Sequence, residues 1–220
     1  MLKINRKYLL SSFLLAFAGL GLGLLAKNRF FYSLDLSIGR SFQTFQPAWF
    51  ISFNRFISVF ELAIFIVAPI WLFLLLRRRH YSAAILILVA VFSWVINRLL
   101  KLGFGIPCPT AAELMKFGVS YSFSGLTAQV FGPGGFFNPL VCYPSGHVFN
   151  YLSFWGITYF LRTKIIDNKF WQKIIACFSL GLIIFVGPAR ISLGAHWFSD
   201  VIGGYLLGLS WLFLLISFYV

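Results

Sequence analysis

Residues 173–219 read KIIACFSLGLIIFVGP, ARISLGAHWFS and DVIGGYLLGLSWLFLLISFY in succession. The first and last pieces, 173–188 and 200–219, are almost continuously apolar, and between them the chain becomes polar at Arg190 and His196. A helix needs about 20 mainly apolar residues to cross the hydrocarbon core of a bilayer. The stretch therefore predicts two membrane-spanning helices joined by a short polar link at one face of the membrane.

The rest of the chain repeats this apolar pattern. Hydrophobic residues make up 60% of the 220 residues and charged residues 10%, whereas soluble domains are about 25% charged. Four further segments predict spanning helices: 8–26, 57–76, 82–100 and 147–162. The first ends at Lys27 after a long apolar run, which favours an uncleaved helix over a signal peptide. No linker or repeat divides the sequence, so we expect one all-α, polytopic membrane domain over residues 1–220 with six transmembrane helices.

Basic residues outnumber acidic residues by 18 to 5, which gives a net charge of +13. They lie in short clusters between the apolar runs, so we interpret them as topology signals and expect no nucleic-acid partner. Lys and Arg beside short loops are enriched on the cytoplasmic side of a membrane. The side that holds both termini carries Lys3, Arg6, Lys7, Arg77, Arg78, Arg79, Arg162, Lys164, Lys169 and Lys173. We therefore expect both termini in the cytoplasm.

Three segments then fall on the outer side: 27–56, 101–146 and 189–199. The first mixes aromatic and basic residues without a continuous apolar length, and this pattern predicts one or more interfacial helices. The second is rich in residues that break regular structure. These residues are Pro107, Pro109, Gly132, Pro133, Gly134, Gly135 and Pro139. We expect this extracytoplasmic loop to cap whatever lies beneath it.

Polar residues stand at four of the predicted outer helix ends. They are Lys101, the run Ser145 to His147, Arg190, and His196 with Asp200. Counting the spans places all of them at the same face, because successive helices alternate in direction. A cluster of cations, imidazoles and a carboxylate suits an anionic substrate.

His196 and Asp200 are four residues apart, so they share one face if the last helix begins by His196. A carboxylate on one ring nitrogen would fix the tautomer that keeps the lone pair on the other nitrogen, as a nucleophile needs. The alternative is a helix-terminal aspartate stabilised by the helix dipole, beside an interfacial histidine. The pair alone leaves both interpretations open.

The segment Pro144-Ser145-Gly146-His147 opens the predicted fourth helix. Backbone N–H groups at a helix N-terminus can hold phosphate oxygens, and a glycine lets the ligand approach closely. The alternative is an ordinary serine N-cap followed by a histidine of no catalytic importance.

Taken together, these residues resemble the type 2 phosphatidic acid phosphatases and their relatives, the vanadium haloperoxidases and bacterial lipid A phosphatases. The first family motif, Lys, six residues, Arg, Pro, is similar to Lys101 through Cys108 and Pro109. The second is present intact as Pro144 to His147. The third resembles Ala189, Arg190, five residues, His196, three residues and Asp200, so the resemblance covers residues 101–200.

The resemblance implies a metal-independent, cofactor-free lipid phosphatase. His196 would attack phosphorus to form a phosphohistidine, Asp200 would hold His196, and His147 would protonate the leaving group and later activate water. The phosphoryl oxygens would be bound by Lys101, Ser145, Gly146 and Arg190. The implied substrate is a lipid phosphate of the bilayer, with lipid A, undecaprenyl pyrophosphate and phosphatidylglycerol phosphate as candidates. We expect the site to face the outside of a bacterial inner membrane.

Two positions depart from the family motifs. Cys108 stands where the family has a phosphate-binding arginine, whose planar, charged fork a cysteine cannot replace. The missing charge would have to come from Arg98 or Lys116. Ala189 in place of serine removes only one hydroxyl.

The cysteines and carboxylates give little support for a metal. Cys108, Cys142 and Cys177 show no zinc-site spacing, and five acidic residues are few for a hard-cation cage. Cys108 and Cys142 share one loop and could pair in an oxidising compartment, but the sequence leaves this open. It also leaves the oligomeric state open.

Two functional alternatives remain. The phosphohistidine could be transferred to a lipid hydroxyl, which would make the protein a lipid phosphotransferase. The substitution at Cys108 could instead leave a lipid-phosphate binder or transporter without turnover. Glu61 and Arg98, near the outer ends of their spans, could form a structural ion pair or serve substrate access.

Overall fold

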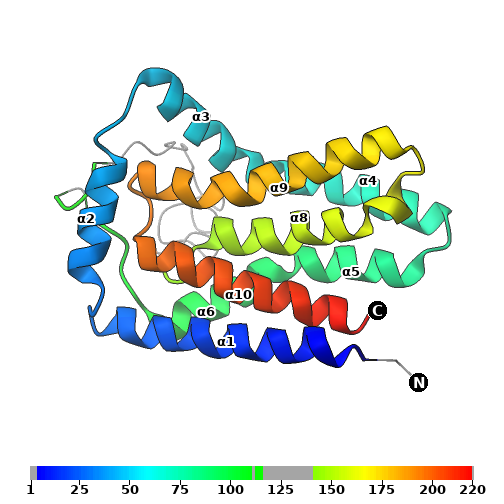
Figure 1. The fold of residues 1–220 in the computed structure, drawn as a ribbon, viewed down its shortest axis with the longest axis horizontal. Coiled ribbons are helices and arrows are strands. Elements are labelled where there is room, and N and C mark those ends of the chain that lie inside the picture. Colours follow the sequence, from blue (N-terminus) through cyan, green and yellow to red (C-terminus); the bar gives the residue numbers. More distant parts are fainter. Residues whose placement is uncertain (1–3, 111, 116–140, 220) are drawn as a thin grey trace, which may run out of the picture.

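The computed structural model describes residues 4–110, 112–115 and 141–219. Long helices lie side by side in a bundle, and both chain ends lie at the same end of it (Figure 1). The described residues contain no strand; they contain one isolated β-bridge, between Pro107 and Val141. The helices are α1 (Arg6–Lys27), α2 (Tyr32–Phe42), α3 (Ala48–Val59), the 3-10 helix η1 (Phe60–Ala63), α4 (Ile64–Arg77), α5 (Tyr81–Val91), α6 (Ser93–Phe104), α8 (Gly146–Ile165), α9 (Lys169–Ser192) and α10 (Phe198–Ser217).

Five helical stretches of the described chain are long and apolar enough to cross a membrane, not the six expected. They are Arg6–Lys27, Ala48–Arg77, Tyr81–Phe104, Lys169–Ser192 and Phe198–Ser217. Helix α8 has 20 residues but is less apolar, and it carries buried polar side chains such as Asn150 and Thr158. It packs against α5, α6, α9 and α10. A helix surrounded by other helices need not be apolar on every face, so a sixth crossing by α8 stays a prediction.

The segment 27–56, for which interfacial helices were expected, contains α2 and the beginning of the stretch Ala48–Arg77. Helix α2 is short and lies across one end of the bundle (Figure 1). Helix α3, however, runs through η1 into α4 as one stretch, Ala48–Arg77, so this span begins nine residues before the expected 57. Helix α3 packs along α9.

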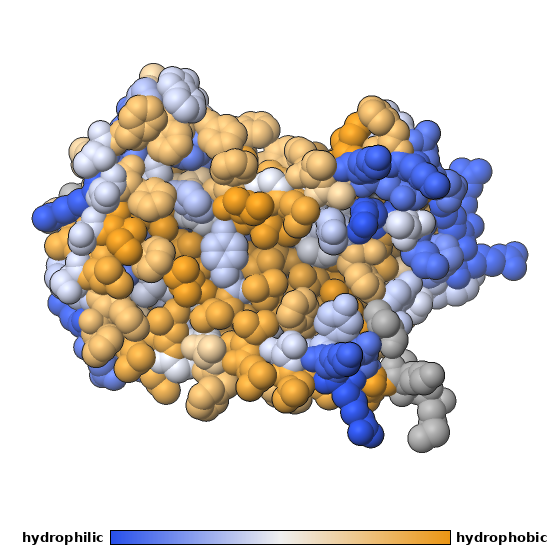
Figure 2. Space-filling model, in the orientation of Figure 1, coloured by the Kyte–Doolittle hydropathy of each residue, from blue (hydrophilic) through white to orange (hydrophobic). Residues whose placement is uncertain are grey.

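Large apolar side chains cover the outside of the bundle. Figure 2 shows a broad hydrophobic surface with a hydrophilic patch at the end where Figure 1 places the termini and the α4–α5 and α8–α9 connections. Phe13 and Phe17 on α1 are 62% and 81% exposed, and Ile66 and Phe73 on α4 are 68% and 63% exposed. Apolar surface of this extent is covered by lipid in a membrane protein. The protein is therefore an integral membrane protein.

Small residues let the helices of the core approach closely. On α10, a Cβ added at Gly204 would lie 2.9 Å from the backbone oxygen of Ser145 and 3.0 Å from the Cβ of Val148. Between α1 and α10, the hydroxyls of Ser12 and Ser210 each donate to the other residue's backbone oxygen, at 2.8 and 2.9 Å. Close backbone contact and short polar bonds of this kind hold membrane helices together.

Helix α9 continues past Pro188, four residues beyond the expected end of the span. Proline has no N–H, so the Ile184 carbonyl loses its usual helical donor. The Tyr205 hydroxyl of α10 donates to the carbonyls of Ile183 and Ile184, at 2.8 and 3.2 Å, and accepts from Gly187 N at 3.3 Å. This repair from a neighbouring helix keeps Arg190 on the last helical turn.

We expect Gly204→Ala to lower the melting temperature in detergent, because its methyl group would press against the Ser145 backbone. Overpacking of this kind costs about 1 to 3 kcal/mol. The matched control is Gly181→Ala on α9, where an added Cβ has no neighbour within 4 Å among the described residues. Equal melting temperatures for the two variants would show that the α8–α10 contact tolerates a methyl group.

Candidate active site

The polar helix ends identified in the sequence meet at the end of the bundle opposite the termini. They belong to the end of α6, the start of α8, the end of α9 and the start of α10 (Figure 1). Lys101 interacts electrostatically with Asp200, Arg190 and Glu61, and Arg190 also acts on His147. The structure thus brings residues from four helices into one cluster within a largely apolar protein.

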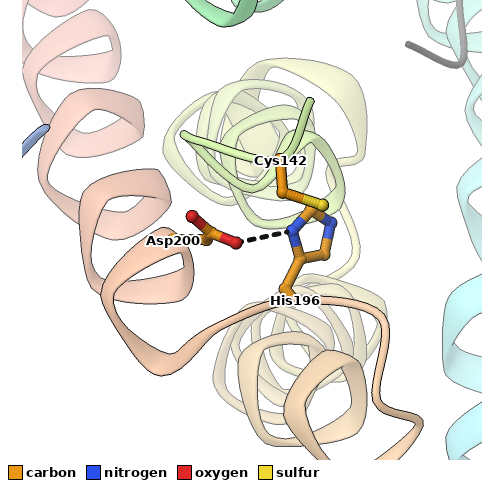
Figure 3. Close-up of side chains that lie close together, drawn as sticks. All are labelled: Cys142, His196 and Asp200. Carbon is orange, nitrogen blue, oxygen red and sulfur yellow. Dashed lines mark hydrogen bonds and ion pairs between the residues drawn. The ribbon is translucent and has the colours of Figure 1, made fainter. Parts of the chain in front are cut away.

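His196 and Asp200 form a buried imidazole–carboxylate pair. His196 Nδ1 lies 3.4 Å from Asp200 Oδ2, and the residues are 5% and 0% exposed (Figure 3). The same oxygen accepts from Trp197 N at 3.0 Å, at the start of α10. His196 precedes the helix, so the contact arises because the α9–α10 link folds back, not from one helical face. Asp200 therefore contacts both the backbone at the start of α10 and the His196 ring, a geometry that fits either interpretation of the pair.

Ser145 and Gly146 form the start of α8 beneath Lys101. Ser145 is fully buried, and its hydroxyl makes no hydrogen bond to another described residue, so it is not an ordinary side-chain N-cap. Its backbone N–H donates to the Asp200 carbonyl at 2.9 Å. A Cβ on Gly146 would lie 3.0 Å from Asn97 Oδ1 and 3.6 Å from Lys101 Cε. The helix terminus therefore presents backbone and hydroxyl groups to a crowded, cationic region.

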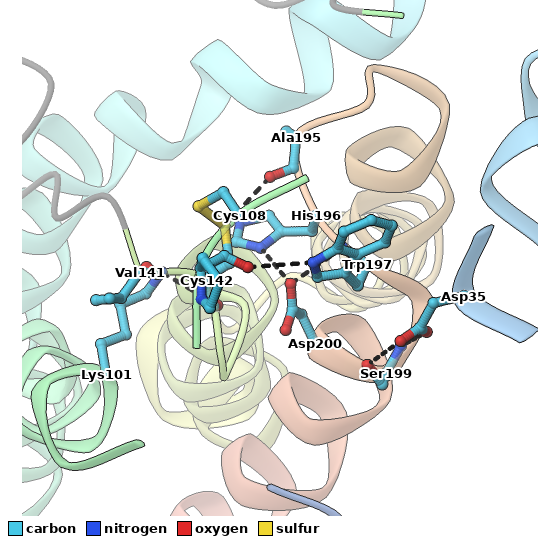
Figure 4. A network of polar contacts seen from close by, with 11 residues as sticks. Asp35, Lys101, Cys108, Val141, Cys142, Ala195, His196, Trp197, Ser199 and Asp200 are labelled. Carbon is cyan, nitrogen blue, oxygen red and sulfur yellow. Dashed lines mark hydrogen bonds and ion pairs between the residues drawn. A yellow bond between two sulfur atoms is a disulfide. The ribbon is translucent and has the colours of Figure 1, made fainter. Parts of the chain in front are cut away.

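Lys101 has a structural task in addition to its charge. Its Nζ donates to the carbonyls of Val141 and Cys142, at 3.0 and 3.2 Å, and the residue is 8% exposed (Figure 4). These carbonyls come directly before the Pro144–His147 motif. Lys101 therefore holds the approach to α8 in place while it supplies positive charge to the cluster.

Cys108 and Cys142 form a disulfide, which the sequence had left open. The Cys142 sulfur lies 3.4 Å from the Ala195 carbonyl, next to His196 (Figure 4). The bonded segment is held further by Cys142 N, which donates to Ile106 O at 2.7 Å, and by Trp197 Nε1, which donates to Pro107 O at 3.1 Å. The position of the family arginine thus holds a covalent anchor for the loop.

One set of side chains has the spacing of metal ligands. Cys142 Sγ, a His196 ring nitrogen and an Asp200 oxygen lie within 4.8 Å of one another (Figure 3). The metal ligand of cysteine is the thiolate, and this sulfur is bonded to Cys108. With the disulfide formed, only His196 and Asp200 of this set remain good metal ligands. That the reaction needs no metal stays a prediction.

The sequence analysis missed one residue of the cluster, Asn97, and considered a different partner for another, Glu61. Glu61, for which a pair with Arg98 was considered, contacts His147, with 3.0 Å between Oε2 and Nε2. Asn97, 4% exposed, lies on α6 one turn before Lys101, and this spacing of four residues could have identified it. Lys116 and most of the expected capping loop, residues 116–140, lie outside the described residues.

A further carboxylate, Asp35 on α2, fixes the start of α10. Its two oxygens accept from the backbone N–H and the hydroxyl of Ser199, each at 2.7 Å (Figure 4). Asp35 is 5% exposed, and this burial raises the pKa of its carboxyl group, although the bonds from Ser199 oppose the rise. Helix α2 is thereby tied to the residue next to Asp200.

The fold and the site define an integral membrane protein with buried histidines, carboxylates and cations suited to an anion. The family described as the PAP2 superfamily matches residues 82–220, and the chain belongs to that superfamily. The structure is similar to the crystal structure of a transmembrane PAP2-type phosphatidylglycerolphosphate phosphatase from Bacillus subtilis, with a TM-score of 0.73 and 20% sequence identity. The likeness covers 95% of this chain and 96% of that chain. Comparison with curated proteins gives no match.

We expect Asp35→Ala to destabilise the protein by about 1 to 3 kcal/mol, because it leaves buried Ser199 groups without acceptors. Asp35→Asn keeps an acceptor for Ser199 N and should retain most of the stability. Folding raises the pKa of Asp35 above its ordinary value of 3.8. The neutral carboxyl group therefore stabilises the folded protein fully below pH 3.8, and this stabilisation is lost as the pH rises through the raised pKa. The melting temperature of Asp35→Asn should therefore fall less than that of the wild type as pH increases; parallel curves would contradict this.

We expect the double variant Cys108→Ser with Cys142→Ser to lose stability. The disulfide closes a loop with a sequence separation of 34, and a crosslink of this size typically contributes about 2 to 4 kcal/mol. Cys108→Arg, which restores the family residue, should lose as much, because it leaves Cys142 unpaired. Thermal unfolding would measure both, with Cys177→Ser, the exposed free cysteine, as the control. A double variant as stable as this control would rule out the anchoring role.

Proposed function

We propose that this protein is a membrane lipid phosphatase that works through a phosphohistidine on His196. The observation that carries the proposal is the buried contact of His196 Nδ1 with Asp200, at 3.4 Å, within a cluster that includes Lys101 and Arg190. A carboxylate on Nδ1 keeps the lone pair on Nε2 and stabilises the positive charge that the ring gains on attack. Membership of the PAP2 superfamily supports a phosphatase.

In the proposed reaction, His196 Nε2 forms a bond to phosphorus while the bond to the leaving oxygen breaks. His147 gives a proton to that oxygen. Water then attacks the phosphohistidine, His147 takes a proton from it, and the nitrogen–phosphorus bond breaks to release inorganic phosphate. Lys101, Arg190, the Ser145 hydroxyl and the backbone N–H of Gly146 bind the phosphoryl oxygens. One such donor is typically worth about 10²- to 10³-fold in rate.

A lipid substrate fits the surroundings of the site. A surface pocket of about 400 Å³ lies between α1 and α6, and its lining includes Leu100, the residue before Lys101. Seven residues line it, almost all apolar: Leu24, Lys27, Ile96, Leu99, Leu100, Gly103 and Phe104. An acyl chain would suit the apolar lining of this pocket. Lipid A, undecaprenyl pyrophosphate and phosphatidylglycerol phosphate are the candidates, and the last of them gives the similar Bacillus subtilis phosphatase its name.

We further propose six membrane crossings, with α8 as the sixth, in a bacterial inner membrane. Both termini would be cytoplasmic and the site would face outward. Two observations support this orientation. The α4–α5 and α8–α9 connections lie at the end of the bundle that holds the termini (Figure 1), and at or beside them stand Arg77, Arg78, Arg79, Lys164 and Lys169. The disulfide lies at the opposite end, and disulfides persist in oxidising compartments outside the cytoplasm.

We expect the purified protein to release inorganic phosphate from at least one lipid of a panel containing these three candidates and phosphatidic acid. His196→Ala should reduce release to the uncatalysed rate, because no nucleophile remains. The control is His80→Ala, at the N-cap of α5, far along the chain from the cluster. Equal background rates of phosphate release for the wild type and His196→Ala on every lipid would contradict the proposal that the protein is a phosphatase.

The same panel separates the two alternatives. Label that appears only on an added acceptor lipid, and never as inorganic phosphate, identifies a phosphotransferase. Saturable binding of a lipid phosphate with no release and no transfer identifies a binder or transporter.

A further inference from the structure

Glu61 is an ionisable residue in the middle of a membrane-spanning stretch. It lies on η1, the 3-10 turn between α3 and α4, within Ala48–Arg77. A charged group within a membrane span is costly and marks a functional site when it faces the protein interior. A 3-10 turn inside a longer helix often marks a functional position as well. Both features call for an explanation of Glu61 beyond packing.

The Glu61 carboxylate is held on both oxygens. Oε2 lies 3.0 Å from His147 Nε2, and Oε1 accepts from Asn150 Nδ2 at 2.7 Å. The Asn150 Oδ1 atom in turn lies 3.1 Å from the hydroxyl of Ser93 on α6. His147 and Asn150 are three residues apart on α8, so both face η1. The carboxylate is therefore placed by side chains from two other helices.

Two hydrogen-bond acceptors face the ring of His147, and the Glu61 carboxylate is one of them. The Ser58 carbonyl also accepts from the ring, so two acceptors, a carboxylate and a carbonyl, face it. An imidazolium has two N–H donors, whereas neutral imidazole has one. Burial of the ring and the positive charges of Arg190 and Lys101 oppose the protonated form, so this form needs an anion beside it. Glu61 is the nearby anion that compensates them.

We propose that Glu61 is a positioning residue that holds His147 in its protonated form, so that His147 can act as a general acid. The inference rests on the proposed function. When substrate binds, the leaving oxygen takes the place of one acceptor while Glu61 keeps Nε2. His147 gives its proton to the leaving oxygen in the first step and regains one from water in the second. Glu61 forms no bond to the substrate and stabilises the imidazolium before and after the cycle.

This role makes the effect of Glu61 depend on the leaving group. An alkoxide leaving group, as in phosphatidic acid, needs a proton because it is a strong base. A nitrophenolate leaving group, as in p-nitrophenyl phosphate, departs without one. Weaker proton donation in the first step should therefore slow the first substrate and spare the second, whereas a merely structural defect would slow both alike.

We expect Glu61→Gln to lower kcat for phosphatidic acid by about 10- to 100-fold, the usual effect of losing the partner that orients a functional histidine. Its rate on p-nitrophenyl phosphate should stay close to that of the wild type. Glu61→Asp, which keeps the charge, should recover part of the lost rate. The control is Glu113→Gln, an exposed carboxylate that binds Tyr32 and Thr110 outside the cluster.

Three results would overturn the inference: equal loss on both substrates, no loss on either, or no recovery by Glu61→Asp when thermal unfolding shows that this variant is folded. His147→Gln provides the comparison: it should slow both substrates, because His147 also activates water in the second step, which the two substrates share. His196→Ala distinguishes the two levels of the proposal. If His196→Ala retains activity, the proposed function is wrong. If His196→Ala abolishes activity and Glu61→Gln has no effect, only the proposed role of Glu61 is wrong.

Discussion

The buried carboxylate of Asp200 is the constraint on which the arrangement of the site depends. One of its oxygens accepts from Trp197 N and faces His196 Nδ1, while its backbone carbonyl accepts from Ser145 N. A single residue therefore fixes the start of α10, the ring of His196 and the start of α8. Its neighbour Ser199 binds Asp35, which ties α2 to the same point. A charge buried this deeply is tolerated only when its hydrogen bonds and nearby cations compensate for lost hydration.

The same requirement explains the departure at Cys108. An arginine at this position would add a third strong cation near Lys101 and Arg190 and would need its own anion or bound phosphate. The disulfide instead fixes the loop covalently, and Lys101 and Trp197 bind the flanking carbonyls.

The sequence predicted the features that depend on local composition and on helix direction. Apolar runs located the spans, and their alternation placed Lys101, Arg190 and His196 at one end of the bundle. Prediction from the sequence failed where a side chain distant in the sequence determines the local structure. Helix α9 continues past Pro188, where the Tyr205 hydroxyl donates to the Ile184 carbonyl that the proline leaves without a donor. Glu61 meets His147 across 86 positions of sequence, and no periodicity within either helix reports such a contact.

The two histidines are each paired with a carboxylate, but the pairs differ in a way that suits unequal roles. His196 and Asp200 are almost completely buried, with side chains 6% and 0% exposed. His147 and Glu61 have side chains 26% and 13% exposed. A nucleophile that carries the phosphoryl group gains from a dry setting, where water reaches the intermediate only from the reactive side. A residue that exchanges protons with a leaving group and then with water must remain accessible to both. The difference in burial therefore supports His196 as the nucleophile and His147 as the acid and base, independently of the order of the motifs in the sequence.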